Sequence, residues 1–190
     1  MIEIREATNI AMNNDAFLRK LLILLVLKEN QRIDGRKKLQ KIIYLVNSLG
    51  WNAIQDYRFH LYGPYSDDLL SEVENLEEMG LINVTKTSSP FGNPFYLHSL
   101  TQKGQNFLES LIRQNDVPAL IDKTRRLSTD LSNFSAELLE VMASLYFLSS
   151  ELPQGDINLW IDNLRELKPN LNDEIVSQGE EIFNIMEYYN

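Results

Sequence analysis

The chain has 190 residues and carries 18 Lys and Arg against 27 Asp and Glu, a formal net charge of −9. It has no cysteine, which excludes disulfides, cysteine nucleophiles and thiolate metal sites. Nucleic-acid affinity comes mainly from basic residues, so a chain this acidic has no general attraction to DNA or to anionic membranes. Its start lacks the pattern of a signal peptide, and its most apolar run, Leu21 to Leu27, is far shorter than the roughly 20 residues of a membrane span. We therefore expect a cytoplasmic protein.

Two helices are predicted at the start of the chain. Residues 1–14 have no clear period and are interpreted as an arm or a fraying helix, and a largely buried helix is predicted from there through Asn30. Residues 31–35 are interpreted as a connection, because Asp-Gly is a turn signal. Apolar residues at helical spacing then predict a second helix over residues 36–49, which Gly50 ends.

Basic residues crowd the first turns of this second helix, although the positive end of the helix dipole disfavours cations there. Two interpretations stay open. The residues form a solvated face, or they contact an acidic or phosphate-bearing partner. The residues concerned are Arg36, Lys37, Lys38 and Lys41.

A short strand, a turn and a third helix follow. Aromatic and polar residues alternate from Tyr57 to Leu61, which predicts a strand, and the Gly-Pro pair after it is expected to turn the chain. Ser66 is a good N-cap for a helix that runs to Met79, with Gly80 as its stop. The segment between strand and helix is interpreted as a structural corner rather than as an active site. It comprises Tyr62, Gly63, Pro64, Tyr65 and Ser66.

A β-hairpin is predicted over residues 81–98, with its turn at 90–93, and Thr101 is predicted to cap a further helix. Helix, helix, hairpin and trailing helix is the order of elements in a winged-helix domain. Beyond residue 116 no strand signal remains, and Pro and Gly separate segments of helical periodicity. Helices are predicted over residues 117–131, 135–151, 156–168 and from 172 onward.

The sequence thus predicts a mainly α fold with a small β-hairpin, in two parts. Residues 1–114 are expected to form a winged helix-turn-helix-like domain with an N-terminal helix. Residues 115–190 are expected to form a helical region that either packs on this domain or mediates oligomerisation, for example as a homodimer.

No group of residues has the spacing of a catalytic or metal-binding site. The two histidines, His60 and His98, are interpreted as structural or surface residues, since no metal-ligand spacing surrounds them. Carboxylates occur as adjacent pairs on predicted helices, where neighbours point about 100° apart and do not converge. Nucleotide-binding glycine motifs and the nucleophile elbow are absent. We therefore expect no catalytic residue, no metal and no cofactor.

The helix predicted over residues 66–79 is a poor candidate for reading DNA. A recognition helix presents Arg, Lys, Asn or Gln to the bases, whereas this helix has no Lys or Arg and carries carboxylates that phosphates would repel. For an anionic contact, the basic start of the preceding helix is the better candidate. The six carboxylates are Asp67, Asp68, Glu72, Glu74, Glu77 and Glu78.

Three segments together resemble a known bacterial family: KLQKIIYL over residues 38–45, YGPYS over 62–66 and LTQKG over 100–104. A KLQK-xx-Y helix followed at this spacing by YGPYS is similar to the YwgA-like proteins and, more distantly, to the Panacea antitoxin domain of the SocA-like group. The resemblance implies a non-enzymatic, mostly helical domain over about residues 20–110. In the Panacea-like group such a domain neutralises a toxin or serves as a proteolytic adaptor. The resemblance implies no catalytic residues.

From these observations we expect a protein-interaction module, antitoxin-like or an adaptor, in a bacterial or phage system, with a toxin or a protease as its partner. The alternative is a winged-helix transcriptional regulator. It would bind DNA through the basic patch and the wing, as a dimer joined by its C-terminal helices. The acidic charge of the chain disfavours this alternative.

Overall fold

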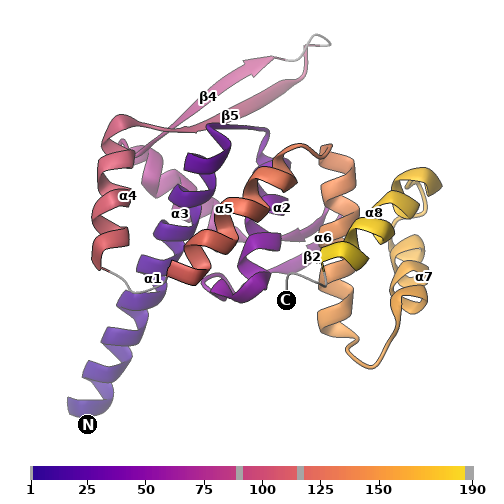
Figure 1. Ribbon diagram of the computed structural model, residues 1–190, viewed down its shortest axis with the longest axis horizontal. Helices are drawn as coiled ribbons and strands as arrows, with labels where there is room; N and C mark the ends of the chain where they lie inside the picture. Colours follow the sequence, from indigo (N-terminus) through magenta and orange to yellow (C-terminus); the bar gives the residue numbers. More distant parts are fainter. Residues whose placement is uncertain (1, 89–91, 115–117, 187–190) are drawn as a thin grey trace.

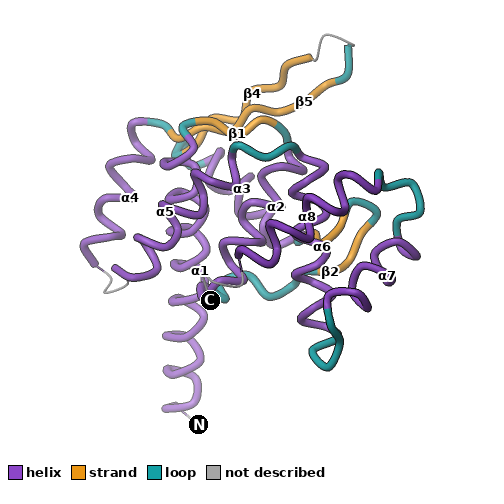
Figure 2. The backbone as a smooth tube through the Cα atoms, turned by 45° about the vertical axis from the view of Figure 1, so that its right-hand side comes forward, coloured by secondary structure: helices purple, strands orange, loops and turns teal. Residues whose placement is uncertain are grey.

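Helices surround two small antiparallel sheets, as the computed structural model shows for residues 2–88, 92–114 and 118–186. The larger sheet has the strand order β1-β5-β4, and the smaller one is the β2–β3 hairpin. Figure 1 and Figure 2 show the larger sheet at one end of the molecule, with β4 and β5 extending away from the helices. The predicted mainly α class is confirmed. The elements are α1 (Ile2–Asn30), β1 (Arg32–Asp34), α2 (Arg36–Val46), the π-helical turn η1 (Asn47–Trp51), β2 (Arg58–His60), β3 (Gly63–Tyr65), α3 (Asp67–Glu78), β4 (Ile82–Ser88), β5 (Pro94–Leu100), α4 (Gln102–Gln114), α5 (Pro118–Ser132), α6 (Ala136–Glu151), α7 (Ile157–Leu167) and α8 (Asp173–Met186).

The second half of α1 lies at the centre of the fold because it is apolar on all sides. Every residue from Leu21 to Leu27 is fully buried, which requires neighbours around the whole helix. These neighbours are α2, α3, α4 and α5 together with strand β5. The helix is continuous from Ile2, so the separate start predicted near residue 14 is not present.

The segment after α1 is a strand and not the connection that the sequence predicts. Arg32–Asp34 forms β1 and pairs antiparallel with β5. Ile33 is buried between two exposed neighbours, which is the alternation of a half-buried strand. Three residues are too few to show this period in the sequence, and the partner of Ile33, His98, lies 65 positions later. The Asp-Gly turn signal was therefore the stronger local pattern.

The end of α2 also differs from the prediction. The α-helix ends at Val46 and continues as the wider turn η1, so Gly50 lies inside helical structure instead of ending it. The side chain of Asn47 accounts for this ending, because its Oδ1 accepts hydrogen bonds from the backbone N–H of Ala53 and Ile54 at 2.8 and 3.1 Å. These bonds replace partners that a continued α-helix would supply.

The β2–β3 hairpin turns one step earlier than predicted. The predicted strand is confirmed as β2, but the chain turns at Leu61 and Tyr62, and the Gly63-Pro64 pair that was expected to form the turn belongs to the returning strand β3. Proline is tolerated in β3 because each strand of a two-stranded sheet is an edge strand.

The predicted helix α3 is confirmed at both ends. The hydroxyl of Ser66 caps it by accepting a hydrogen bond from Leu69 N at 2.9 Å. Gly80 follows the last turn with a φ of +68°, the left-handed conformation in which glycine ends helices. Capping residue, apolar stripe and stop are all local signals, and all three agree here.

Glycine is required where α4 meets the larger sheet. Thr101 caps α4 as predicted, since its Oγ1 accepts from Gly104 N at 2.9 Å. A Cβ at Gly104 would lie 2.0 Å from Leu81 O, so only glycine permits this approach of helix and strand. The LTQKG segment is thereby explained by packing.

The remaining helices pack on the first part of the chain. α5 contacts α1 and α2, α6 contacts α2 and β3, and α7 and α8 contact α6. The predicted starts of α6 and α7 are confirmed by their capping side chains, Ser135 and Asp156, which accept from Leu138 N and Leu159 N at 3.1 and 3.0 Å.

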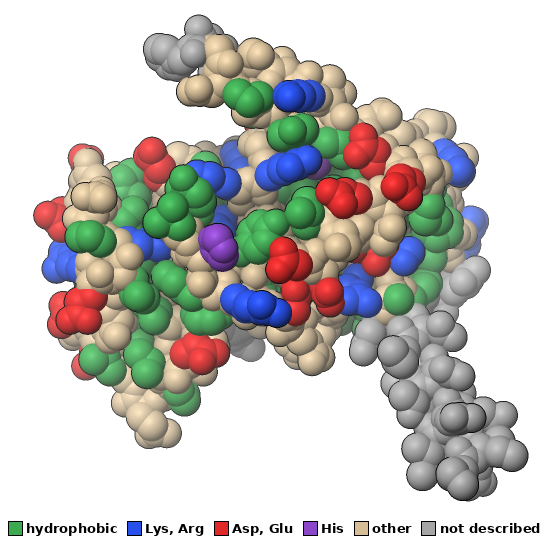
Figure 3. Space-filling view, turned by 180° about the vertical axis from the view of Figure 1, so that it is seen from behind, with side chains coloured by type: hydrophobic (Ala, Val, Ile, Leu, Met, Phe, Trp, Pro, Cys, Tyr) green, Lys and Arg blue, Asp and Glu red, His purple; other side chains and the backbone are tan. Residues whose placement is uncertain are grey.

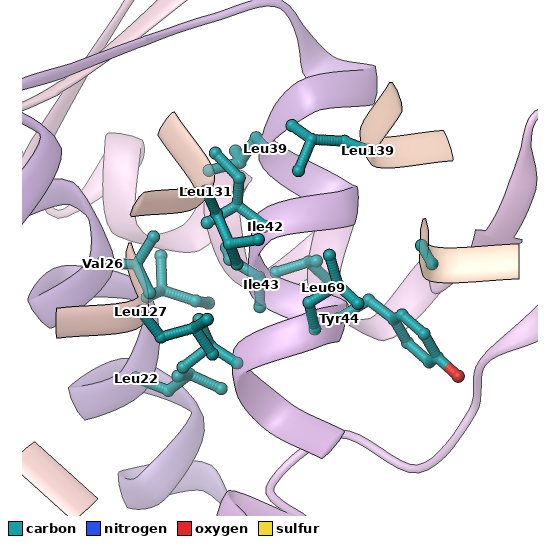
Figure 4. Packing of buried hydrophobic residues seen from close by; sticks show 14 of the residues in the cluster. Leu22, Val26, Leu39, Ile42, Ile43, Tyr44, Leu69, Leu127, Leu131 and Leu139 are labelled. Atoms are coloured by element: carbon teal, nitrogen blue, oxygen red, sulfur yellow. The ribbon is translucent and has the colours of Figure 1, made fainter. Parts of the chain in front are cut away.

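A single apolar cluster joins helices from both parts. Figure 4 shows side chains of α1, α2, α5 and α6 in the same buried space. Truncating one such side chain to alanine costs about 2–5 kcal/mol of stability. In the described parts of the chain, no helix is both long and apolar enough to cross a membrane. The labelled core residues include Leu22, Val26, Leu39, Ile42, Leu127, Leu131 and Leu139.

Candidate functional site

Hydrogen bonds join the KLQK segment of α2 to the YGPYS segment. The amide of Gln40 makes two bonds with the backbone of Ser66: Nε2 donates to Ser66 O at 2.9 Å, and Oε1 accepts from Ser66 N at 3.2 Å. Lys41 Nζ donates to Pro64 O at 2.6 Å. All three bonds are buried, where an unpaired group costs about 1–3 kcal/mol. Side chains of α2 therefore fix the position of β3.

The hydroxyl of Ser66 is fully used by the corner. It donates to Asp56 Oδ1 and accepts from Leu69 N, and the other carboxylate oxygen of Asp56 accepts from Asp68 N at 3.1 Å. These bonds hold the start of α3 against the loop that precedes β2. They support the interpretation of Ser66 as a structural residue.

Gly63 brings β3 close to α6. Its φ is +80°, and a Cβ there would lie 2.7 Å from Ser144 Oγ. Another residue would be strained by the left-handed backbone and would also collide with α6. The glycine of YGPYS thus serves both conformation and packing.

The C-terminal part of the chain holds the tip of the hairpin. Lys168, directly after α7, donates through Nζ to Leu61 O at 2.8 Å and forms an ion pair with Glu140 of α6. Both charged side chains are mostly buried. Because a buried charge is costly without its partner, this pair fixes the tip relative to α6.

The hairpin and the first turns of α2 enclose a pocket of about 320 Å³. None of the described side chains that line it is acidic, although the whole chain carries a net charge of −9. Figure 3 shows a face of the molecule on which a histidine and basic side chains lie among apolar ones, beside a group of acidic side chains. The pocket is lined by Arg36, Lys37, Gln40, Lys41, His60, Tyr62, Gly63 and Tyr65.

Three of the four basic residues that were candidates for an anionic contact line this pocket. The guanidinium of Arg36 lies 3.9 Å from the ring centre of Tyr96, and Lys37 Nζ lies 2.9 Å from that of Tyr62. These cation–π contacts orient both side chains. Lys38 instead donates to Ser132 O of α5 at 2.7 Å and takes no part in the pocket.

Lys41 is the buried cation of the pocket, with 2% of its surface exposed. Burial lowers the pKa of its ammonium group to about 8, the nearby Glu140 acts in the opposite direction, and Lys168 and Lys37 lower the pKa further. The ammonium group therefore still carries its charge at neutral pH.

A smaller pocket of about 60 Å³ adjoins the first one along α3. The two share Arg36, Gln40 and Tyr65, and the smaller pocket is also lined by Glu74 and Glu77. We call the larger of these two pockets the main pocket. Carboxylates of α3 thus lie beside the main pocket and not in its wall.

Sequence reasoning missed several residues of this site. His60 was interpreted as a structural or surface residue, and the structure places it in the pocket wall. Lys168 and Glu140 were not singled out, because a lysine at a helix end is explained by the helix dipole alone. The other histidine, His98 of strand β5, is buried with Nδ1 3.3 Å from Ile33 O, and burial lowers its pKa.

Metal-ligating side chains are not grouped in the described residues, since no three of His, Asp and Glu lie close enough together to hold a metal ion.

The chain is similar to a protein of Bacillus subtilis (strain 168) that is described as uncharacterized protein YwgA. The two sequences are 34% identical over 125 residues, which cover 64% of this chain and 70% of the relative. No protein-family model matches the chain. The similarity confirms the resemblance to YwgA-like proteins that the KLQK and YGPYS segments indicated.

Proposed function

The chain belongs to the YwgA family of bacterial proteins, and from its surface we propose that it is a non-enzymatic protein-interaction module of the cytoplasm. Within this class it acts as an antitoxin-like or adaptor component of a bacterial or phage system. The toxin or protease partner of this proposal comes from the resemblance of the KLQK helix and the YGPYS segment to the Panacea domain.

An exposed apolar projection carries the proposal. At the tip of the β2–β3 hairpin, Leu61 is 71% exposed and Tyr62 is 45% exposed. Leu167 is 53% exposed and directly precedes Lys168, which binds Leu61 O. We call these three residues, Leu61, Tyr62 and Leu167, the tip surface. Exposed apolar groups that lie together mark interaction sites.

The tip surface is held in place before any partner arrives. Lys41 of α2 binds Pro64 O in strand β3, and Lys168 at the end of α7 binds Leu61 O in the turn, so the returning strand and the turn of the hairpin are both anchored. A preformed contact surface loses little conformational freedom on binding, which favours affinity. Arg36 and Lys37 lie on the same side, and neither forms an ion pair with a described residue. The partner that fits has an apolar side chain next to acidic ones.

We further propose that the N-terminal part is a winged helix adapted to protein contacts. The element order α1, β1, α2, α3, β4, β5 and the sheet order β1-β5-β4 support this arrangement. A helix-turn-helix has a turn of about 3–4 residues between its two helices, whereas here η1 and the β2–β3 hairpin separate α2 from α3. The β2–β3 hairpin, with the tip surface on it, therefore lies where a helix-turn-helix domain has its short turn.

The charges of α3 support protein contacts over DNA contacts. Asp68 and Glu72 pair with Arg19 and Lys20 of α1 at 3.0 and 2.9 Å. The remaining carboxylates of α3 are exposed, and α3 has no Lys or Arg that could neutralise a phosphate. A helix with this surface would be repelled by the DNA backbone.

Co-purification with the products of the genes adjacent to its own tests the proposal. We expect the tagged wild-type chain to retain such a partner and Leu61→Asp to lose it, because a charge at the tip cannot enter an apolar contact. Met79→Asp is the matched control: Met79 is 43% exposed and lies at the end of α3, away from the tip surface. Equal loss in both variants would contradict the proposed surface.

A gel-shift assay with duplex DNA at two salt concentrations tests the alternative. Salt-sensitive binding that the double variant Arg36→Glu with Lys37→Glu abolishes would establish a DNA-binding regulator and overturn the interaction module.

A further inference from the structure

The interior of the main pocket has the chemistry of a small-molecule site. We propose that it binds a phosphorylated ligand with a planar ring, which is the chemistry of a mononucleotide. The proposed protein contact and this ligand share Tyr62, Arg36 and Lys37, but only the protein contact needs the exposed Leu61, and only the ligand needs the pocket between the hairpin and α2. The Leu61→Asp variant and a nucleotide titration therefore test the two proposals separately.

The phosphate end of the site is formed by the first turns of α2. Arg36 and Lys37 stand at the start of this helix, which has no acidic residue in its first turn and no capping side chain. The start of a helix attracts anions through its free N–H groups and its dipole. Among the described side chains of the pocket wall no carboxylate competes for these cations.

An uncompensated buried charge points to an anionic ligand. Lys41 and Lys168 bring two ammonium groups into this region, and Glu140 supplies one carboxylate, which pairs with Lys168. Lys41 is bound only to a neutral carbonyl, Pro64 O, among the described residues. Because the two ammonium groups share one nearby carboxylate, one positive charge is left over, and an anion in the pocket would compensate it.

The aromatic side chains of the hairpin, which lie beside the basic ones, suit a planar ring. Tyr62, Tyr65 and His60 contribute three rings, and those of His60 and Tyr65 lie with centroids 5.8 Å apart at 47°. Aromatic side chains stack on nucleobases with little dependence on sequence. The pocket volume of about 320 Å³ lies at the lower end of the range for small-molecule sites, about 300–1,000 Å³.

The acidic edge of the neighbouring small pocket limits the number of phosphates. Glu74 and Glu77 line the small pocket, which shares Arg36 with the main pocket. A chain of two or three phosphates that extended from Arg36 into the small pocket would meet these carboxylates and be repelled. The site therefore favours a monophosphate over a triphosphate.

Calorimetric titration of the full chain tests the inference. The probes are the four ribonucleoside monophosphates, adenosine triphosphate, uncharged adenosine and inorganic phosphate. We expect at least one monophosphate to bind more tightly than the other three kinds of probe. The double variant Arg36→Gln with Lys37→Gln should weaken this binding by about tenfold or more. Lys38→Gln, on the same helix but outside the pocket, should leave it unchanged.

Several outcomes would overturn the inference. One is that no monophosphate binds at millimolar concentration. Another is that inorganic phosphate binds as tightly as the monophosphates, which would remove the planar ring from the proposal. A third is equal binding by the double variant and the wild type, which would place the ligand elsewhere. Binding of an acidic peptide without any nucleotide binding would also overturn it. Arg36 and Lys37 are exposed, so the double variant should fold.

Discussion

The two hairpins of this molecule are stabilised in opposite ways. In the β4–β5 hairpin, seven residues of each strand pair in a continuous register, and β1 adds a third strand at its base. In the β2–β3 hairpin only three residues of each strand pair, and an isolated hairpin of this kind is not stable in water. Its position depends on side chains from elsewhere, namely Gln40, Lys41 and Lys168.

Buried side-chain bonds can thus take over the role of a long strand ladder. The long hairpin depends on its own backbone pairing, so single side chains matter little to it. The short hairpin depends on a few buried bonds from α2 and from the end of α7, so single substitutions should matter greatly. This difference matters for the proposed functions, because the tip surface and the main pocket both include residues of the short hairpin.

The largest difference between the hairpins should appear when their lysines are removed. Lys168→Met leaves Glu140 buried without its counter-charge and Leu61 O without its donor. We expect a loss of about 3–5 kcal/mol in the free energy of unfolding, measured by urea denaturation. Lys86→Met on the exposed side of β4 should change stability by no more than about 0.5 kcal/mol.

A second substitution tests the origin of this loss. Adding Glu140→Gln to Lys168→Met removes the unpaired charge and should recover part of the stability. If the added Glu140→Gln substitution recovers no stability, the ion pair between Lys168 and Glu140 does not fix the tip of the hairpin.

Two glycines, one in each hairpin region, have the same backbone conformation but different surroundings. Gly63 in the short hairpin and Gly92 before β5 both have a φ of +80°. Alanine is strained equally at both positions, but its Cβ would collide with Ser144 Oγ only at Gly63, and nothing lies within 4 Å at Gly92. We expect Gly63→Ala to be more destabilising than Gly92→Ala by about 1–3 kcal/mol. Equal losses in thermal or urea unfolding would show that β3 does not pack tightly on α6.

A pH dependence should also separate the two regions. Burial lowers the pKa of Lys41 from 10.5 to about 8, and it lowers the pKa of His98 in strand β5 from 6.5. In both cases the unfolded chain binds the proton more tightly, so stability is lost as the pH falls. The loss occurs between about pH 10.5 and 8 for Lys41 and below about pH 6.5 for His98.

Urea unfolding across the pH range measures both effects. Each group contributes at most about 1.4 kcal/mol per pH unit. Lys41→Met should abolish the rise in stability between pH 8 and 10 and leave the acid side unchanged. Measurements stay below pH 10, because burial raises the pKa of Tyr44 to about 12 and ionisation of unfolded tyrosine then favours unfolding. An alkaline rise that persists in the variant would assign it to another group.

The parts of the fold that could be predicted are those with local causes. α3 and α6 begin at capping serines, and α3 ends at a glycine, so their bounds follow from a few neighbouring residues. β1 could not be predicted, since it exists only through pairing with β5. The Gly-Pro pair misled the prediction for a related reason, because the position of the hairpin depends on bonds from Gln40, Lys41 and Lys168, which are distant in the sequence.

The candidate site could be predicted in part. A basic cluster at the start of α2 is visible in the sequence, and three of its members line the pocket. Which lysine points away from the pocket could not be predicted, because this depends on distant partners. Lys38 binds a carbonyl of α5, whereas Lys41 binds a carbonyl of β3. The contribution of Lys168 could not be predicted either, since it depends on the packing of distant helices.

The bond from Lys168 to Leu61 has a consequence for the order of events during protein synthesis. The two residues are 107 positions apart, and the ribosome releases the chain from its N-terminus, so that earlier parts fold first. The β2–β3 hairpin can therefore take its final position only after α7 has been made and has packed against α6. A prematurely terminated chain would contain every pocket-lining residue and still lack the anchored hairpin. Only a chain that has been synthesised beyond Lys168 would display the anchored surface to other molecules.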